Sequence, residues 1–270
     1  MAPLLISSTQ NPRIKQLMAL QQHSQQRRSQ NRVVIEGARE LQHCVKAGFT
    51  IETVFYCPTL FDINKLQTAH YELIEVTSQI YDKIAYRGST EGVIAIARPR
   101  LLSLSDIELG DDPLIVVLEG VEKPGNIGAV LRSADAARAT AVIVCDPLTD
   151  LYNPNLIRSS LGAIFTVPCL TCSSQECISF LKENNINILT AQLQDSELYY
   201  NTSMRGPTAI IMGTESTGLT QPWRDAATAH IRIPMRGELD SLNVSVSTAI
   251  LLFEAVRQRL SATTLTTIPS

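Results

Sequence analysis

The back part of the chain contains a series of short, uninterrupted apolar runs, and this pattern limits the fold more than any other feature. A strand buried on both faces of a sheet reads as a continuous apolar run, whereas a half-exposed strand alternates. Helical patterns occur between runs, at 127–139, and after the last one, at 243–260. This alternation predicts an α/β fold, a mostly parallel sheet with helices on both faces. The runs are residues 114–119, 141–145, 186–191, 209–212 and 230–233.

The first hundred residues show a shorter α/β pattern. Strand-like and helix-like segments follow each other within it, which predicts a small α/β domain of its own. Helices are expected at 11–29 and 38–47, and strands at 32–36, 53–57 and 92–97.

Pro, Ser and a short acidic run occur together in residues 98–112, a composition typical of a linker. We therefore predict a front domain over 1–105 and a back domain over 112–270. The chain has 23 Lys and Arg against 26 Asp and Glu, a formal charge of −3. That balance excludes a broadly polycationic nucleic-acid binder but leaves room for a local basic patch.

Positive charge is concentrated near the start of the chain, where residues 1–46 contain seven Lys and Arg and two Glu. Such a basic stretch is either a solvated helix face or a contact surface for phosphates, and the sequence leaves both interpretations open. For the second, we expect Arg13, Arg27, Arg28 and Arg32 to contact RNA.

Cysteine and histidine spacing gives little support for a metal site. Cys169-x-x-Cys172 with Cys177 nearby lacks a second ligand pair or a close histidine, so ordinary thiols are the better interpretation and no metal is expected. No apolar run approaches the roughly 20 residues that cross a bilayer, and no secretory signal is visible. We expect a cytoplasmic protein with no membrane association.

Three loops that contain glycine or proline follow apolar runs, at 119–135, 211–219 and 233–249. Ligands of open parallel sheets bind outside the carboxyl ends of the strands, so these loops are candidate binding elements. They contain no dinucleotide-binding glycine motif, no phosphate-binding P-loop and no serine nucleophile elbow. A backbone-rich, apolar pocket suited to an adenine-containing ligand remains, with three ordinary turns as the alternative.

These loops resemble the three motifs of the SpoU (TrmH-like) RNA 2′-O-ribose methyltransferases, which belong to the SPOUT superfamily. Residues 126–132, 213–219 and 233–247 match the motifs and occur in the order of that family. The front part is similar, more loosely, to the ribosomal-protein-like substrate-binding domain of the family, at 8–15 and 34–41.

The resemblance implies that the C-terminal part of the back domain is threaded through a loop as a trefoil knot, one of the rare exceptions to unknotted folds. It also implies binding of S-adenosylmethionine in the knot, a homodimer, and methyl transfer to a ribose 2′-hydroxyl in structured RNA. Ribosomal RNA is the more expected substrate and transfer RNA the less expected one.

The resemblance further implies a set of site residues. Leu193, Gly213, Ile233 and Leu242 match positions that hold the cofactor. Asn126, Asn243 and Arg132 match positions at the reacting groups. Glu215 either binds RNA or caps the helix that follows it.

A guanidinium has a pKa above about 12 and is a poor base, so we expect Arg132 to hold the target phosphate and to stabilise the developing alkoxide. The first alternative is a catalytically inactive RNA-binding or ribosome-associated protein of the same fold. A small-molecule methyltransferase is the second, and the separate front domain weakens it.

Overall fold

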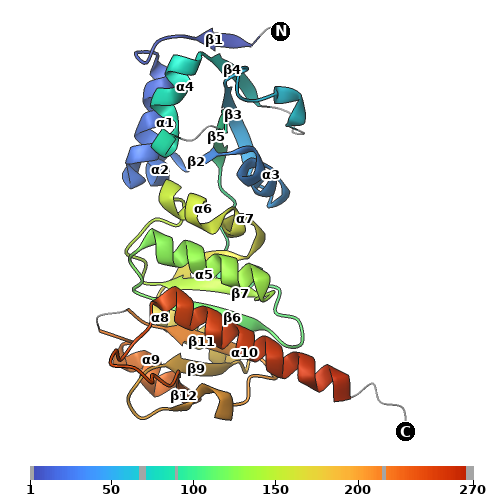
Figure 1. Ribbon diagram of the computed structural model, residues 1–270, viewed down its shortest axis with the longest axis vertical. Helices are drawn as coiled ribbons and strands as arrows, with labels where there is room; N and C mark the ends of the chain where they lie inside the picture. The colour runs from blue at the N-terminus through green and yellow to red at the C-terminus, as the bar shows by residue number, and fades with distance from the viewer. Residues whose placement is uncertain (1–2, 67–70, 89–90, 215–216, 266–270) are drawn as a thin grey trace. The chain divides into compact units, whose positions relative to one another are not determined.

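The computed structural model describes residues 3–66, 71–88, 91–214 and 217–265, and the contacts within it divide the chain into two compact units. The front unit comprises Met1–Leu101 together with Asp150–Thr166, and the back unit comprises Leu102–Thr149 together with Val167–Ser270. The segment Asp150–Thr166 is thus a return of the chain to the front unit, which the sequence analysis did not anticipate (Figure 1).

The front unit contains a five-stranded sheet with the strand order β1-β4-β3-β5-β2. β5 runs antiparallel to both of its neighbours, and the other neighbouring strands are parallel. The strands are β1 (Leu4–Ile6), β2 (Val33–Glu36), β3 (Thr50–Tyr56), β4 (Glu72–Val76) and β5 (Val93–Arg98). The helices are α1 (Pro12–Gln22), α2 (Ser24–Gln30), α3 (Ala38–Lys46), α4 (Ser78–Ile84), α6 (Pro154–Ser160) and α7 (Ala163–Thr166), with the 3-10 turns Ile63–Lys65 and Tyr86–Gly88.

The single helix predicted over 11–29 is in fact two helices, α1 and α2. Asn11 caps α1 by accepting a hydrogen bond from the Arg13 backbone N–H at 2.9 Å. The helix ends because His23 adopts an extended backbone conformation, with φ −118° and ψ 114°, before α2 begins. The apolar face of α1 is buried over the sheet of the front unit. Because these residues pack in the core, their helical spacing in the sequence predicts α1 correctly.

The back unit contains a seven-stranded sheet with the order β10-β12-β9-β11-β6-β7-β8, and each neighbouring pair is parallel. Its strands are β6 (Leu114–Glu119), β7 (Ala141–Cys145), β8 (Cys169–Cys172), β9 (Asn187–Ala191), β10 (Glu197–Leu198), β11 (Thr208–Met212) and β12 (Ala229–Arg232). Its helices are α5 (Pro124–Ala136), α8 (Ser174–Glu183), α9 (Gln221–Ala226) and α10 (Val244–Leu265), with the 3-10 turns Leu104–Asp106 and Tyr199–Asn201.

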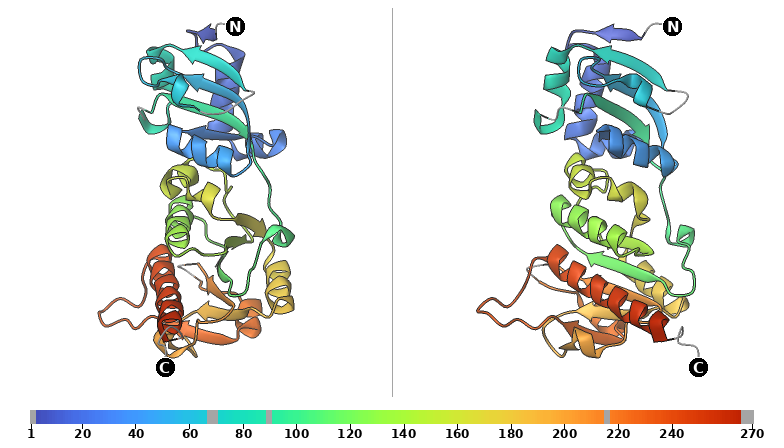
Figure 2. Two further views of the ribbon diagram at one scale, coloured as in Figure 1. Left: turned by 90° about the vertical axis from the view of Figure 1, so that its right-hand side faces the viewer. Right: turned by 45° about the vertical axis from the view of Figure 1, so that its right-hand side comes forward.

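Helices cover both faces of this sheet. α5 and α10 pack against each other on one face, whereas α8 and α9 pack together on the other (Figure 2). All residues of the central strands β6, β7 and β11 are buried, as expected for strands between two helix layers. The predicted α/β fold, with its mostly parallel sheet and a smaller front α/β unit, is confirmed.

In the described part of the chain, no helix combines the length and the apolar character that a bilayer crossing requires.

Candidate functional site

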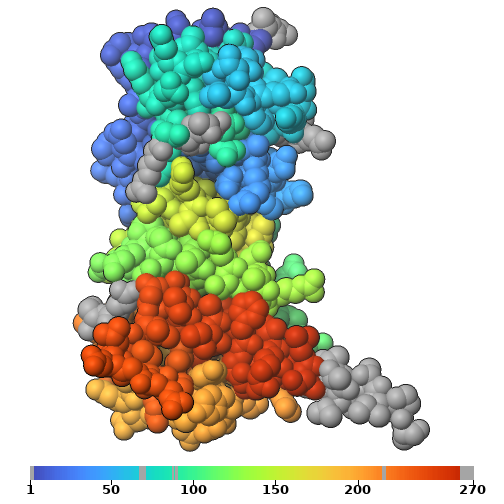
Figure 3. All heavy atoms as spheres, in the orientation of Figure 1, coloured from blue at the N-terminus to red at the C-terminus, as the bar shows by residue number. Residues whose placement is uncertain are grey.

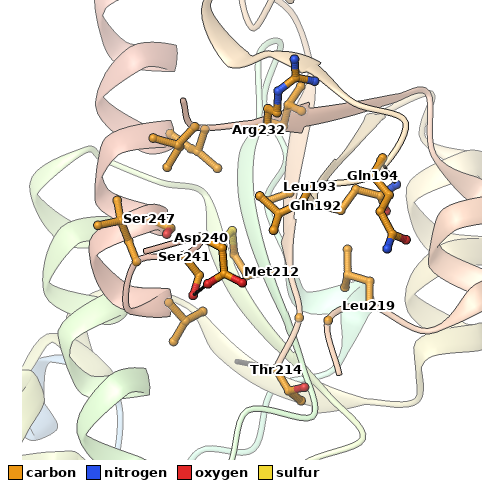
Figure 4. Close-up of a pocket in the computed structure, with 18 of the residues that line it drawn as sticks. Gln192, Leu193, Gln194, Met212, Thr214, Leu219, Arg232, Asp240, Ser241 and Ser247 are labelled. Atoms are coloured by element: carbon orange, nitrogen blue, oxygen red, sulfur yellow. Dashed lines mark hydrogen bonds between the residues drawn. The ribbon is translucent and has the colours of Figure 1, made fainter. Parts of the chain in front are cut away.

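A pocket with a volume of about 430 Å³ opens at the carboxyl end of the parallel sheet (Figure 4). Its walls are the loops that follow β9, β11 and β12, together with the first turns of α10. The volume falls within the range of about 300–1,000 Å³ that is usual for small-molecule sites. The strand ends thus produce the type of site that the sequence pattern predicts.

The four residues expected to hold the cofactor all line this one pocket. Leu193 follows β9, Gly213 follows β11, Ile233 follows β12, and Leu242 precedes α10. They are far apart in the sequence, so their convergence depends on the strand order, in which β9 lies between β11 and β12. Their contacts with a cofactor remain a proposal, which we take up below.

Gly213 allows the two ends of the second loop to lie against each other. A Cβ atom at this position would lie 2.4 Å from the carbonyl carbon of Gly218, so no side chain is tolerated without a shift of the backbone. Thr214 and Gly218 form an isolated antiparallel bridge, which closes the loop. Gly218 has a φ of +67°, a conformation that favours glycine. Glu215, a predicted RNA contact, lies outside the described residues.

A buried carboxylate, Glu119, fixes the far end of the same loop. It accepts hydrogen bonds from the Thr220 backbone N–H at 2.9 Å and from Thr220 Oγ1 at 2.6 Å. Thr220 precedes α9, whose Trp223 indole N–H donates to Ser174 Oγ at 2.9 Å. Sequence reasoning missed this positioning role because Glu119 and Thr220 are 101 residues apart in the chain.

Two buried polar atoms of the pocket lining, Gln192 Oε1 and Arg224 Nε, have no hydrogen-bond partner among the described residues. An unsatisfied buried polar group is costly, so each atom suits a ligand that supplies its partner. S-adenosylmethionine offers both hydrogen-bond donors and acceptors beside an apolar adenine ring. Together with the loop closure at Gly213, this lining fits the expected cofactor.

Asn126 and Asn243 meet beside a second, smaller cavity. Asn243 Nδ2 donates a hydrogen bond to Asn126 Oδ1 at 3.2 Å, and Asn243 Oδ1 accepts from the Ser245 N–H at 3.0 Å. Asn126 lines a cavity of about 170 Å³ that shares Gly213, Thr214 and Val244 with the larger pocket. The two predicted polar residues therefore lie where the larger pocket adjoins a further space.

Arg132 is exposed on α5 and lines neither of these cavities in the described part of the chain. It lies six residues after Asn126 on the same helix, which corresponds to about 9 Å along the helix axis. Within the described residues its side chain forms no hydrogen bond or ion pair, so the guanidinium can bind an anion.

The four arginines expected to contact RNA differ in their surroundings, and one expectation is wrong. Arg27 is buried, and its Nε donates to Asp150 Oδ2 at 2.6 Å while Nη1 donates to the Leu20 carbonyl at 2.6 Å. It therefore stabilises the front unit and cannot reach a phosphate. Arg13 is exposed and pairs with Glu72, and Arg32 is partly buried and pairs with Glu52 at 2.6 Å.

Arg28 is the arginine that fits the original expectation. It is exposed on α2, and its guanidinium has no partner among the described residues. The difference between the neighbours Arg27 and Arg28 follows from helix geometry, because successive residues are about 100° apart around a helix.

Comparison with known proteins gives matches to both parts of the chain. Residues 113–253 match the model of the SpoU rRNA Methylase family, and residues 11–95 match the model of the MRM3-like substrate binding domain. The 23S rRNA (guanosine-2′-O-)-methyltransferase RlmB of Vibrio parahaemolyticus is 34% identical over 206 residues, which are 74% of this chain and 83% of that relative.

Solved structures also match nearly the whole chain. A crystal structure of an RNA 2′-O ribose methyltransferase covers 95% of this chain and is itself covered completely, with a TM-score of 0.83 and 42% identity. The AdoMet-bound rRNA methyltransferase from Sinorhizobium meliloti has a TM-score of 0.86 and 28% identity over 94% of this chain and 97% of that one.

Proposed function

This chain belongs to the SpoU rRNA methylase family, and we propose that it transfers a methyl group from S-adenosylmethionine to a ribose 2′-hydroxyl in ribosomal RNA. The observation that carries the proposal is the pocket at the carboxyl end of the sheet, with its two unpartnered polar atoms and the adjoining pair of asparagines. Relatives that are 23S rRNA 2′-O-methyltransferases, from Vibrio parahaemolyticus and Streptomyces viridochromogenes, support the choice of substrate.

The pocket residues hold the cofactor, whose sulfonium supplies the methyl group. Leu193, Ile233 and Leu242 provide apolar surface for the adenosyl part, while Gln192 Oε1 accepts and Arg224 Nε donates hydrogen bonds. Methyl transfer is an in-line displacement, so its rate depends mainly on how well the two reacting groups are positioned. The bridge between Thr214 and Gly218, which closes the second loop, supports that positioning.

Asn126, Asn243 and Arg132 act on the RNA side of the reaction. The hydrogen bond between the two asparagines fixes the orientation of both amides at the smaller cavity, where they orient the target ribose. A ribose hydroxyl is a weak nucleophile until its proton is partly removed. That proton would pass to solvent water, and S-adenosylhomocysteine would be the leaving product. Arg132 binds the neighbouring phosphate and stabilises the negative charge that develops on the 2′-oxygen.

The two parts of the chain divide the work. Residues 1–105 bind the RNA substrate and residues 112–270 transfer the methyl group, a division supported by the separate family matches. Arg28 contributes a phosphate contact from the front part, with Arg13 and Arg32 as secondary contacts that exchange their carboxylate partners for phosphate. Glu215 remains a proposed RNA contact.

The assembly and the chain path are part of the same proposal. The protein is a cytoplasmic homodimer, and the segment 233–243 passes through the preceding loop as a trefoil knot. Gly213 and Leu219 line one pocket together with Ile233 and Leu242, so the chain before and after β12 comes together there, as the proposed knot requires. A crystal structure in which this segment passes outside the loop would contradict it.

Labelled S-adenosylmethionine tests the function directly. The purified protein is incubated with ribosomal RNA, transfer RNA and a low-molecular-weight extract, and label is counted in each fraction. We expect incorporation into ribosomal RNA. Binding of RNA with no transfer would indicate the catalytically inactive alternative. Label only in small molecules would indicate a small-molecule methyltransferase.

A further inference from the structure

Three cysteine side chains from three different elements meet at the carboxyl end of the sheet. Cys145 ends β7, Cys172 ends β8, and Cys177 lies in the first turns of α8. Their sulfur atoms all lie within 4.8 Å of one another, and the Cys145 and Cys172 sulfurs are 4.0 Å apart. All three are free thiols.

The backbone holds the three sulfurs in this arrangement. Cys145 and Cys172 are direct partners in the parallel ladder between β7 and β8. The start of α8 is fixed by a capping box, in which the Ser173 N–H donates to Glu176 Oε2 at 2.8 Å and the Glu176 N–H donates to Ser173 Oγ at 3.3 Å. Because the three ligands are already ordered, binding of an ion costs little further conformational entropy.

The 4.0 Å between the Cys145 and Cys172 sulfurs matches a pair of thiolate ligands, and the Cys177 sulfur lies within 4.8 Å of both. Zinc–sulfur bonds are about 2.3 Å long, which places the sulfurs of a tetrahedral or trigonal site about 3.8–4.0 Å apart. A disulfide requires about 2.05 Å between sulfurs. We propose that Cys145, Cys172 and Cys177 bind one Zn²⁺ ion, with water in the fourth position.

Access and chemistry agree with this assignment. Cys145 and Cys177 are fully buried, whereas Cys172 is partly exposed, so the ion enters past Cys172. Beside the cluster, the Asp146 carboxylate accepts hydrogen bonds from Ser174 Oγ at 2.6 Å and from the Ser174 N–H at 3.2 Å. Three thiolates select thiophilic ions such as Zn²⁺ and disfavour Mg²⁺ and Ca²⁺, which prefer oxygen.

The ion would stabilise the fold and take no part in methyl transfer. None of the three cysteines lines either described cavity of the methyl-transfer site. The Cys145 carbonyl accepts a hydrogen bond from the Gly120 N–H at 3.1 Å, so the cluster supports the loop that leads into α5. Binding exchanges three thiol protons for one Zn²⁺ ion and ties β7, β8 and α8 together, which raises the thermal midpoint of unfolding.

The test measures Zn²⁺ binding to the reduced full-length protein in competition with a chromophoric chelator. We expect one Zn²⁺ per chain for the wild type, and affinity at least about tenfold weaker for Cys172→Ser, because loss of a ligand exceeds the usual effect of a supporting residue. Cys169→Ser is the matched control, since Cys169 is buried in the same strand but outside the cluster. It should bind like the wild type.

Co²⁺ substitution of the unaltered wild type gives a second readout that needs no variant. Thiolate coordination should produce intense charge-transfer absorption and tetrahedral visible bands. Absence of these bands, absence of stoichiometric Zn²⁺ binding at micromolar concentration, or unchanged binding by Cys172→Ser would overturn the proposal. The midpoints of the zinc-free variants show whether they are folded.

Discussion

Gln192 and Arg224 line the larger pocket together with the four residues that the sequence analysis named for it. Both present a buried polar atom without a partner to the pocket, a feature that exists only after the loops have come together. The loops themselves were predicted from the sequence, because glycines after apolar runs indicate turns at strand ends. The two unpartnered atoms, Gln192 Oε1 and Arg224 Nε, could not be predicted, because a sequence does not show which polar groups lack a hydrogen-bond partner after folding.

Replacing Gln192 by Met should weaken cofactor binding. The variant keeps the volume of the side chain but removes the acceptor, and loss of one hydrogen bond costs about 1 kcal/mol, equivalent to about fivefold in affinity. Calorimetry with S-adenosylhomocysteine measures the effect. Gln42→Met, at an exposed position on α3, serves as the control. Equal affinities for the two variants would remove Gln192 from the site.

Replacing Arg132 by Ala should lower the rate of methyl transfer by about a hundredfold or more, the usual cost of losing a group that stabilises developing charge. Arg132→Lys should also fail, since a point charge does not reproduce the planar guanidinium. Cofactor affinity should stay unchanged in both variants, because Arg132 lies outside the pocket lining. A lysine variant with a nearly normal rate would contradict the proposed role.

Arg27 and Arg28 form a matched pair, and the structure separates their roles. Arg28→Gln should weaken RNA binding and reduce the salt slope by about one unit, with no change in stability. Arg27→Gln should instead destabilise the fold by about 3 kcal/mol, because it removes the charged partner of the largely buried Asp150 carboxylate. RNA titrations at several salt concentrations and chemical unfolding distinguish the two. Identical salt slopes for wild type and Arg28→Gln would exclude the phosphate contact.

Among the elements, the apolar strands β6, β7, β9, β11 and β12 were predicted to within one residue, whereas several other elements were not predicted. β6 covers Leu114–Glu119, as predicted. Its first five residues are apolar and Glu119 is hydrogen-bonded, so all six are stable in the interior of the sheet. The helix α6 has seven residues, too few to display an amphipathic period, and the sequence analysis missed it. β10 has only two residues, too few to show the alternation of a strand, and the sequence analysis missed it as well.

The closing helix α10 depends on a carboxylate for its docking. Glu254 Oε1 accepts a hydrogen bond from Gln258 Nε2 at 2.8 Å, and Gln258 Oε1 accepts from the Met204 N–H at 2.8 Å. Hydrogen bonds from Arg257 hold the pKa of Glu254 below its ordinary value. A depressed pKa contributes stability above the pKa of the unfolded chain, about 4.3, and the contribution is lost as pH falls through the folded pKa.

Glu254→Gln should therefore remove part of the acid sensitivity of folding. Between about pH 6 and pH 3, the thermal midpoint of the variant should fall less than that of the wild type. Glu183→Gln, at the exposed end of α8, should retain the wild-type profile. Parallel profiles for wild type and Glu254→Gln would show that this carboxylate does not support the helix.

For the whole molecule, the two-part organisation was visible in the sequence but the return segment Asp150–Thr166 was not. Composition marks a linker where the chain leaves a domain, and residues 98–112 have that composition. Nothing comparable marks 150–166, which packs on the front unit through contacts such as the Arg27–Asp150 ion pair. Long-range pairing of this kind is decided by tertiary contacts.

The proposed homodimer can be tested by a substitution in an exposed row of apolar residues on α10. Val246, Phe253 and Leu260 are spaced by seven residues on one side of the helix and are 46%, 49% and 65% exposed. Figure 3 shows part of α10, in red, at the surface of the back unit. Phe253→Glu should convert a dimer into a species of 29.7 kDa in light scattering. Leu148→Glu, also exposed, should leave the mass unchanged. A wild-type monomer at micromolar concentration would contradict the homodimer.

Nucleoside analysis of ribosomal RNA after reaction tests the central claim most directly. Ribosomal RNA is incubated with S-adenosylmethionine and either the wild type or Arg132→Ala, digested to nucleosides and measured by mass spectrometry. The proposed function predicts a nucleoside with the added methyl group on its ribose, formed by the wild type and not by the variant. A methyl group on the base, or no methylated nucleoside with folded, cofactor-binding wild type, would contradict 2′-O-methyl transfer by this protein.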